Sequence, residues 1–158
     1  MNRLSDQEEA VVRDRLANAK ECLAAAKDTF QLKYYKTSAG RLYYAVFNLM
    51  RALLNCDGIE MKHHSGVISE FRKRYIKTQI MDSSVSDLIS QLYDIRSKSD
   101  YSVFYEISAE DIEPFFEETE AFFKRLKHFS NPCTIIFLLK RVNNIVLSVL
   151  YPRTYHCL

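Results

Sequence analysis

The sequence predicts an all-α protein: an antiparallel up-and-down bundle of four to five helices, with room for an extra C-terminal helix. Three observations predict this class. Glycine and proline are scarce, three of each in 158 residues, so the sequence lacks most of the turn residues that a protein of short strands and tight turns requires. Apolar residues make up 47% of the chain, which is enough for a folded core. They recur at helical spacings of three and four residues.

The two longest helices are expected in the first third of the chain. The first covers residues 6–33, with Ser5 as a suitable N-cap and Glu8 three residues later to complete a capping box. The second covers residues 36–56, and Gly58 in "CDG" is a plausible turn residue after it. Each carries one apolar stripe, which is typical of an amphipathic helix with a single buried face.

Three shorter helices are expected further along, over residues 65–76, 83–97 and 108–126. Ser108 caps the last of them, because an acid again follows three places later, and acids crowd the first half of this helix, where they suit its positive end. The connections between the five segments are short. Short connections favour antiparallel neighbours and hence a bundle.

The end of the chain has a different composition. We expect residues 1–130 to form the helical bundle and residues 131–158 to form an atypical apolar tail. Two apolar clusters in this tail are split by "KRVNN". Neither approaches the roughly 20 apolar residues that a membrane span needs, so no membrane segment is expected. The tail could instead add a sixth helix or a dimer contact.

Charge and cysteine usage place further bounds on function. The formal net charge of +2 gives no whole-molecule attraction to nucleic acid or membrane, so any such contact must come from a local patch. The four cysteines are far apart and form no C-x-x-C unit. The N-terminal segment is too charged for a signal peptide. We therefore expect free thiols and a cytoplasmic location.

The usual signatures of enzymes are missing from the sequence. It contains no P-loop, no nucleophile elbow and no H-E-x-x-H helix. The adjacent residues His63 and His64 cannot share one helical face, because ligands on one face need a spacing of three or four. We interpret them as two surface histidines before a helix start. No metal and no cofactor are expected.

A basic segment lies in the expected third helix. Arg72, Lys73, Arg74 and Lys77 outnumber the nearby acids and would attract a phosphate backbone. The alternative interpretation is a solvated helix face, which is the commoner role of such a run. The spacing does not decide between them.

A second polar segment follows the expected fourth helix. Arg96 offers a planar fork that matches phosphate, and Asp100 could act as a general base or hold the arginine in place. Tyr101 and Tyr105 offer hydroxyls and aromatic faces on which a base can stack. The alternative is an intrahelical pair between Arg96 and Asp100, at a spacing of four, worth a few tenths of a kcal/mol.

Three stretches of the chain resemble the HEPN domain family (higher eukaryotes and prokaryotes nucleotide-binding). They are "AGRLYYAVFNLMRALL" at residues 39–54, "GIEMKHHSGVISEFRKRYIKT" at 58–78, and "LYDIRSKSDYSVFYEISAEDIEPFFEETEAFF" at 92–123. The paired tyrosines, the H-S-G before the third helix and the R-x-x-x-D-Y segment are specific in combination, although none is specific alone. Together they cover most of the chain.

The resemblance implies a helical bundle that commonly dimerises and is often paired with a minimal nucleotidyltransferase as a toxin–antitoxin system. Active members are metal-independent ribonucleases with the motif R-x(4–6)-H near the dimer seam. Arg96 matches the family arginine, but Asp100 and Tyr101 stand where the histidine is expected. A histidine pKa of about 6.5 suits proton transfer, whereas tyrosine titrates at about 10 and aspartate at about 3.9. The motif is therefore degenerate.

Three functions stay open at this point. In the first, the chain is an RNA-directed toxin subunit, in which Arg96, Asp100 and Tyr101 act across a homodimer. A nucleotidyltransferase antitoxin would restrain it by modifying Tyr101 or Tyr105. In the second, the chain is a non-catalytic subunit that binds a nucleotide or supports the transferase. In the third, it is a helical scaffold with no nucleotide role.

Overall fold

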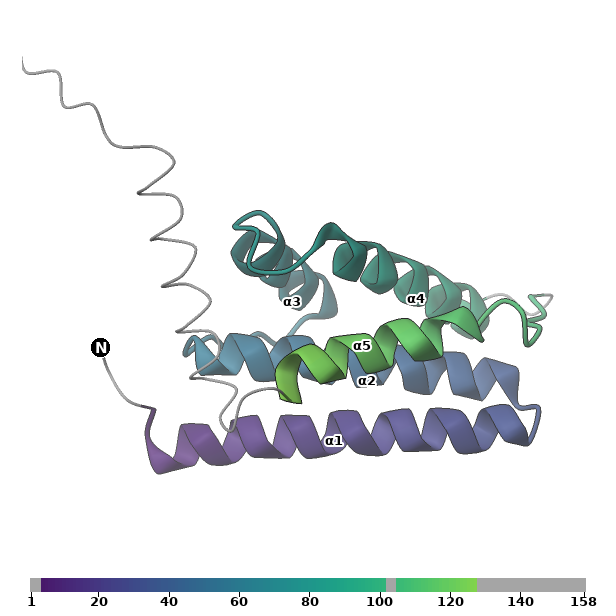
Figure 1. Ribbon diagram of the computed structural model, residues 1–158, viewed down its shortest axis with the longest axis horizontal. Helices are drawn as coiled ribbons and strands as arrows, with labels where there is room; N and C mark the ends of the chain where they lie inside the picture. Colours follow the sequence, from purple (N-terminus) through teal and green to yellow (C-terminus); the bar gives the residue numbers. More distant parts are fainter. Residues whose placement is uncertain (1–3, 102–104, 128–158) are drawn as a thin grey trace, which may run out of the picture.

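The computed structural model describes residues 4–101 and 105–127 and confirms the all-α class (Figure 1). These residues form α1 (Asp6–Gln31), α2 (Tyr35–Cys56), α3 (His64–Phe71), a π-helical turn η1 (Arg72–Ile76), α4 (Ser83–Tyr101) and α5 (Pro114–Lys127). The tail expected over residues 131–158 lies outside the described residues.

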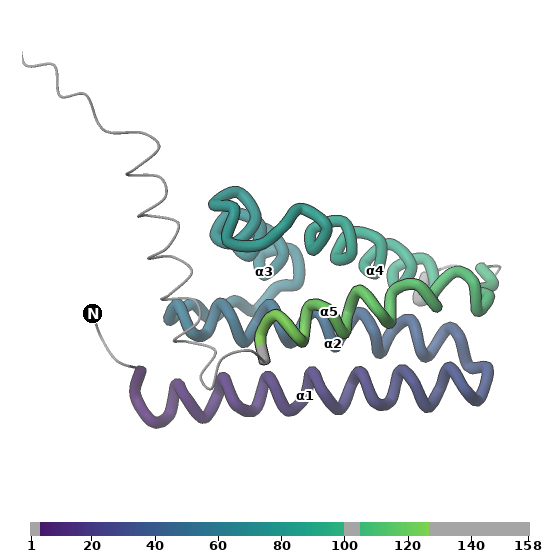
Figure 2. Tube along the Cα trace, in the orientation of Figure 1, coloured from purple at the N-terminus to yellow at the C-terminus, as the bar shows by residue number. Residues whose placement is uncertain are grey.

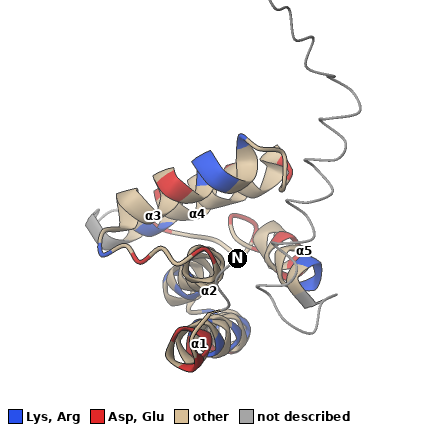
Figure 3. Ribbon diagram, turned by 90° about the vertical axis from the view of Figure 1, so that its left-hand side faces the viewer, with Lys and Arg blue, Asp and Glu red and all other residues tan. Residues whose placement is uncertain are grey.

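The long helices alternate in direction along the chain, as the tube in Figure 2 shows. Helix α2 is central: it contacts α1, α3, α4 and α5 (Figure 3). Helices α3 and α4 lie on the side of α2 opposite to α1. Because α2 meets neighbours on several sides, its buried face is wide, and it supplies more core residues than any other described helix. The side chains that build the candidate site project from α2, α3 and α4.

Small residues bring α1 and α2 close together. Ala19, Ala26 and Ala39 are fully buried along this seam. Ser38 is also fully buried, and its Oγ donates to the Ala26 carbonyl oxygen at 2.8 Å. The predicted capping box at the start of α1 is present, because the Ser5 side chain accepts from the Glu8 N–H and the Glu8 carboxylate accepts from the Ser5 N–H.

The segment predicted as one helix over residues 65–76 is divided. Helix α3 ends at Phe71 and widens into η1, where the Lys77 N–H donates to the Arg72 carbonyl at 2.9 Å. The wider turn accompanies an anchored tyrosine: the buried Tyr75 hydroxyl donates to the Leu53 carbonyl oxygen of α2 at 3.0 Å. Such a turn is not visible in the sequence pattern, because the apolar spacing continues unbroken through it.

The ends of α4 and α5 also differ from the predictions. Helix α4 continues past residue 97 to Tyr101. Ser108 and Asp111 do pair, with the Ser108 N–H 2.8 Å from Asp111 Oδ2, but they close a turn that precedes the helix. Helix α5 begins only at Pro114. Proline lacks an N–H and has a fixed φ, so it is well suited to the first position of a helix.

The cysteine prediction is confirmed for one residue and wrong for another. Cys22 on α1 carries a free thiol. Cys56, at the end of α2, is disulfide-bonded, which corrects the expectation of free thiols throughout. Cys133 and Cys157 lie outside the described residues. Within residues 4–101 and 105–127, no helix combines the length and apolarity that crossing a bilayer requires.

Candidate functional site

Arg96 projects from α4 onto two consecutive tyrosines of α2. Its Cζ lies 5.6 Å from the centroid of the Tyr43 ring and 5.5 Å from that of the Tyr44 ring. Its Nη2 donates to the Tyr44 hydroxyl at 3.3 Å. The guanidinium is half-buried. Cation–π contact with two adjacent rings and one hydrogen bond therefore hold a permanent positive charge in a defined orientation at the edge of the bundle.

His64 joins the same cluster from the first turn of α3. Its Nδ1 lies 3.0 Å from the Tyr43 hydroxyl oxygen, and its ring stacks on Phe47 with centroids 4.2 Å apart. The ring is also 6.1 Å from Tyr44, edge to face. Tyr43 and Tyr44 thus contact both Arg96 and His64, so a cation and an imidazole share one aromatic support. We call these four residues the Arg96–His64 cluster.

The interpretation of both histidines as surface residues is wrong for His64. His63 is exposed, whereas His64 is half-buried and has a hydrogen-bonding partner on α2. The sequence did contain the relevant signal. His64 lies three, four and seven residues before Val67, Ile68 and Phe71, so it continues their buried stripe backwards by one turn.

Burial sets the protonation states in this cluster. It raises the pKa of Tyr43 to about 12, against the opposing effect of the Arg96 charge. Burial also lowers the pKa of His64 below its ordinary value, and the positive charges of Arg96 and Arg51 lower it further. Tyr43 and His64 are therefore both neutral at neutral pH. The cluster carries a net positive charge, which favours an anionic ligand.

A groove lies beside the cluster, between α3–η1 and α4. Its volume is about 710 Å³. Tyr93, which is 38% exposed, lines the groove, and its ring centroid lies 5.9 Å from that of Tyr43. The groove therefore adjoins the Arg96–His64 cluster through this tyrosine. Its other lining residues are Ser65, Ile68, Ser69, Arg72, Lys73, Lys77, Ile89, Ser90 and Asp94.

Two of the predicted RNA-contacting residues have exposed side chains in this groove. Lys73 and Lys77 line it, and Lys73 also forms a 3.8 Å ion pair with Glu70. Arg72 lines the groove too, but its Nη2 donates to Ser90 Oγ at 2.6 Å and to the Ser86 carbonyl at 3.3 Å. Its guanidinium therefore ties η1 to α4.

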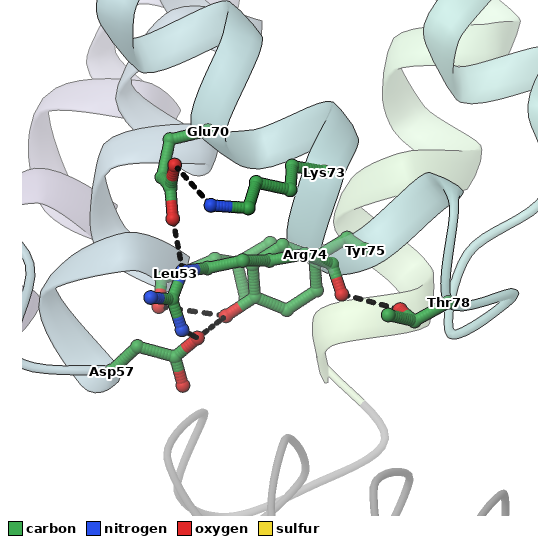
Figure 4. A network of polar contacts seen from close by, with 7 residues as sticks. All are labelled: Leu53, Asp57, Glu70, Lys73, Arg74, Tyr75 and Thr78. Atoms are coloured by element: carbon green, nitrogen blue, oxygen red, sulfur yellow. Dashed lines mark hydrogen bonds and ion pairs between the residues drawn. The ribbon is translucent and has the colours of Figure 1, made fainter.

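Arg74 belongs to a different network, shown in Figure 4. Its Nε lies 2.5 Å from Glu70 Oε1, and its Nη1 lies 3.7 Å from Asp57 Oδ2. The same Asp57 oxygen accepts from the Tyr75 hydroxyl at 3.1 Å. The carboxylates of Glu70 and Asp57 together compensate the positive charge of Arg74. This arginine therefore joins α3–η1 to the end of α2.

The remaining predicted site residues lie at the end of α4 or shortly after it in the chain. Asp100 and Tyr101 form its last two positions, and their side chains lie outside the described residues. Tyr105 is half-buried, and the Lys98 Nζ lies 6.0 Å from its ring centroid. Asp100 and Tyr101 are one turn of helix beyond Arg96, so the backbone keeps them near the cluster. Among the described side chains, no three His, Cys, Asp or Glu residues form a group that could hold a metal ion.

Comparison with known proteins identifies relatives of this chain. The sequence profile of the HEPN domain matches residues 12–129. A Methanocaldococcus jannaschii protein named "Putative toxin MJ0605" is 33% identical over 109 residues, which cover 69% of this chain and 81% of that protein. Another from the same organism, "Putative toxin MJ0142", is 30% identical over 114 residues, covering 72% and 78%. A Thermotoga maritima "UPF0332 protein" is 26% identical over 117 residues, covering 74% and 89%.

The fold and the site define a class of protein: an up-and-down helical bundle with an arginine of one helix held on paired tyrosines of the central helix. Within that class, the chain belongs to the HEPN domain family, because the family profile extends from the first turns of α1 past the end of α5. The resemblance found in the sequence is confirmed.

Proposed function

We propose that this protein is an RNA-directed, toxin-like HEPN subunit in which Arg96 binds a backbone phosphate. The observation that carries the proposal is the guanidinium held in a defined orientation by the Tyr43 and Tyr44 rings and the Tyr44 hydroxyl. An arginine in a defined orientation suits a phosphate diester better than a mobile lysine does. Two relatives with toxin names support the same direction.

The groove between α3–η1 and α4 supplies a path for the strand. Lys73 and Lys77 lie along it, and each phosphate that they neutralise adds sequence-independent affinity. Tyr93 lies where the groove meets the cluster and exposes part of its ring, which suits stacking against a base. The proposed substrate is therefore single-stranded RNA, with one phosphate at Arg96 and neighbouring phosphates over the lysines.

Assembly and regulation complete the proposal. Two copies would form a homodimer that brings their Arg96 sites together, with Asp100 and Tyr101 at the seam. A minimal nucleotidyltransferase would act as the antitoxin and modify Tyr101 or Tyr105. Both elements rest on membership of the HEPN family and on the position of Asp100 and Tyr101 at the end of α4.

Cleavage in EDTA tests the proposal directly. Purified wild type, Arg96→Ala and Arg13→Ala are incubated with RNA, and the products are separated on a denaturing gel. Arg13 is the matched control, because its side chain on α1 is 70% exposed and α1 lies across α2 from the cluster. We expect wild type and Arg13→Ala to cleave and Arg96→Ala to be inactive. Equal RNA affinity and equal activity in all three proteins would refute the proposal.

One observation favours a second function, that of a non-catalytic nucleotide-binding subunit. The motif residues after Arg96 include no histidine, whereas the aromatic surroundings of Arg96 suit a nucleotide with its phosphate on the arginine and its base on Tyr93. Nucleotide binding that depends on Arg96, in a wild type that leaves RNA intact, would support this function over the first.

A further inference from the structure

The cluster contains the type of residue that the R-x(4–6)-H motif lacks. The sequence has no histidine in the four to six positions after Arg96. The fold instead brings His64 from the start of α3 against the two tyrosines that support Arg96. Each of these tyrosine rings lies within 5.6 Å of the Arg96 Cζ and within 6.1 Å of the His64 ring, centroid distances in both cases. Arginine and imidazole therefore flank the same small region.

We propose that His64 is the catalytic proton-transfer residue of the RNA-cleaving site, acting from α3 in place of the missing motif histidine. This inference rests on the proposed ribonuclease function. It assigns the 2′-hydroxyl as the group that His64 deprotonates, and RNA rather than DNA as the substrate that can react.

The ring of His64 is held by contacts on two sides. Phe47 stacks against it with an interplanar angle of 19°, and Tyr43 contacts Nδ1. Because Nδ1 is engaged, Nε2 is the nitrogen left to meet a substrate. A phenol can accept as well as donate, and Nε2 can take up a proton only in the tautomer whose Nδ1 carries the hydrogen. The Tyr43 hydroxyl therefore accepts from Nδ1–H both before and after Nε2 gains a proton, and the hydrogen bond is kept throughout.

The charges around His64 favour a base that works only with substrate present. Burial lowers the pKa of His64, and the positive charges of Arg96 and Arg51 lower it further, which keeps the ring in its neutral, proton-accepting form. A phosphate bound at Arg96 would offset that repulsion. Negative charge that develops on the phosphoryl oxygens during the reaction would offset it further. The neutral His64 ring is thus ready to accept a proton before the reaction, and the imidazolium that forms is stabilised as the reaction proceeds.

The step is an intramolecular transesterification. His64 takes the proton from the ribose 2′-hydroxyl while the 2′-oxygen forms a bond to phosphorus. The bond between phosphorus and the 5′-oxygen breaks, and that oxygen leaves with the electron pair and takes a proton from water. The imidazolium then returns its proton to the resulting hydroxide. The products are a 2′,3′-cyclic phosphate and a free 5′-hydroxyl, and no metal or redox partner is consumed.

The neighbouring histidine provides the matched control. His64→Gln should lower single-turnover cleavage by about 100-fold or more, which is the usual contribution of a general base, with RNA affinity changed by less than about threefold. His63→Gln alters an exposed ring and should cleave like wild type. Added imidazole should restore part of the activity of His64→Gly. Arg96→Ala should lose affinity as well as cleavage, which separates the two roles.

A measurement on the unmodified protein guards against a variant that fails to fold. The His64 ring is titrated by NMR with and without 3′-UMP, and its pKa should start below the ordinary value and rise when the nucleotide binds. The acidic limb of the cleavage pH profile should follow the same titration. Cleavage by His64→Gln equal to wild type, or a His64 pKa unmoved by bound nucleotide, would overturn the inference while leaving the role of Arg96 intact. A wild type that cleaves no RNA would overturn the inference together with the ribonuclease function.

Discussion

Replacing Tyr75 by phenylalanine tests how the end of α2 is joined to η1. The Tyr75 ring is fully buried, so phenylalanine keeps the core packing and removes only the hydroxyl. That hydroxyl contacts the Leu53 carbonyl oxygen at 3.0 Å and Asp57 Oδ2 at 3.1 Å (Figure 4). In a continuing α-helix the Asp57 N–H would donate to the Leu53 carbonyl, but here it donates to the Leu54 carbonyl. Leu53 therefore lies in the last turn of α2, where the backbone carbonyls need hydrogen-bond donors from outside the helix.

The magnitude follows from these two contacts. A neutral buried hydrogen bond contributes about 1 kcal/mol, and one to a charged group contributes about 1.5–3 kcal/mol. The single hydroxyl hydrogen is shared between the two acceptors, so the contributions do not add in full. We expect Tyr75→Phe to lower the free energy of unfolding by about 2 kcal/mol. In a chain of this size that corresponds to a fall in Tm of about 4–8 °C.

Urea denaturation followed by circular dichroism provides the measurement. Tyr34→Phe is the control, because Tyr34 is 62% exposed. Burial raises the pKa of Tyr75 above its ordinary value, so the hydroxyl stays protonated and the difference between the variants should persist from pH 6 to pH 9. If both variants lose less than about 0.5 kcal/mol, the hydroxyl does not stabilise this junction and the reasoning is refuted.

Three further predictions concern other parts of the molecule. Ser38→Ala removes the hydrogen bond to the Ala26 carbonyl and should cost about 1 kcal/mol in urea denaturation, without changing RNA affinity. The pKa of His64 is lower in the folded protein than in the unfolded chain, so the unfolded state binds more protons as pH falls through about 6.5. Wild type should therefore lose more stability between pH 7.5 and pH 5.5 than His64→Gln does, and equal losses would contradict the assigned burial. Replacing Lys73 and Lys77 together by alanine should reduce the slope of log affinity for single-stranded RNA against log salt by about 1.4, which anisotropy titrations at several NaCl concentrations can measure.

Much of the fold follows from the sequence because the helices are amphipathic over several turns. Each of the five predicted segments contains a helix, and the Ser5–Glu8 capping box is present as the local pattern predicted. The predictions failed at one feature that depends on a partner distant in the chain and at one helix boundary. The widening at η1 accompanies the Tyr75 contact with α2, and the start of α5 is displaced to Pro114.

The candidate site was predicted in part. Arg96 stood out because of its neighbours and its match to a family motif, and the groove does contain Lys73 and Lys77 among the predicted basic residues. Arg72 and Arg74 could not be distinguished from them by charge alone. Only their contacts with Ser90 and with the Glu70 and Asp57 carboxylates show that these two guanidinium groups join elements of the fold.

The sequence by itself determined the class of structure, the approximate helices and the family, and it singled out Arg96 as a candidate site residue. These depend on periodicity, capping and local motifs, which are properties of neighbouring residues. Only the tertiary structure decided that His64, 32 positions before Arg96 in the chain, shares the tyrosines that hold it. The physical reason is that helix packing, and not spacing along the chain, determines which side chains meet, and α2 presents Tyr43 and Tyr44 to α3 and α4 at once.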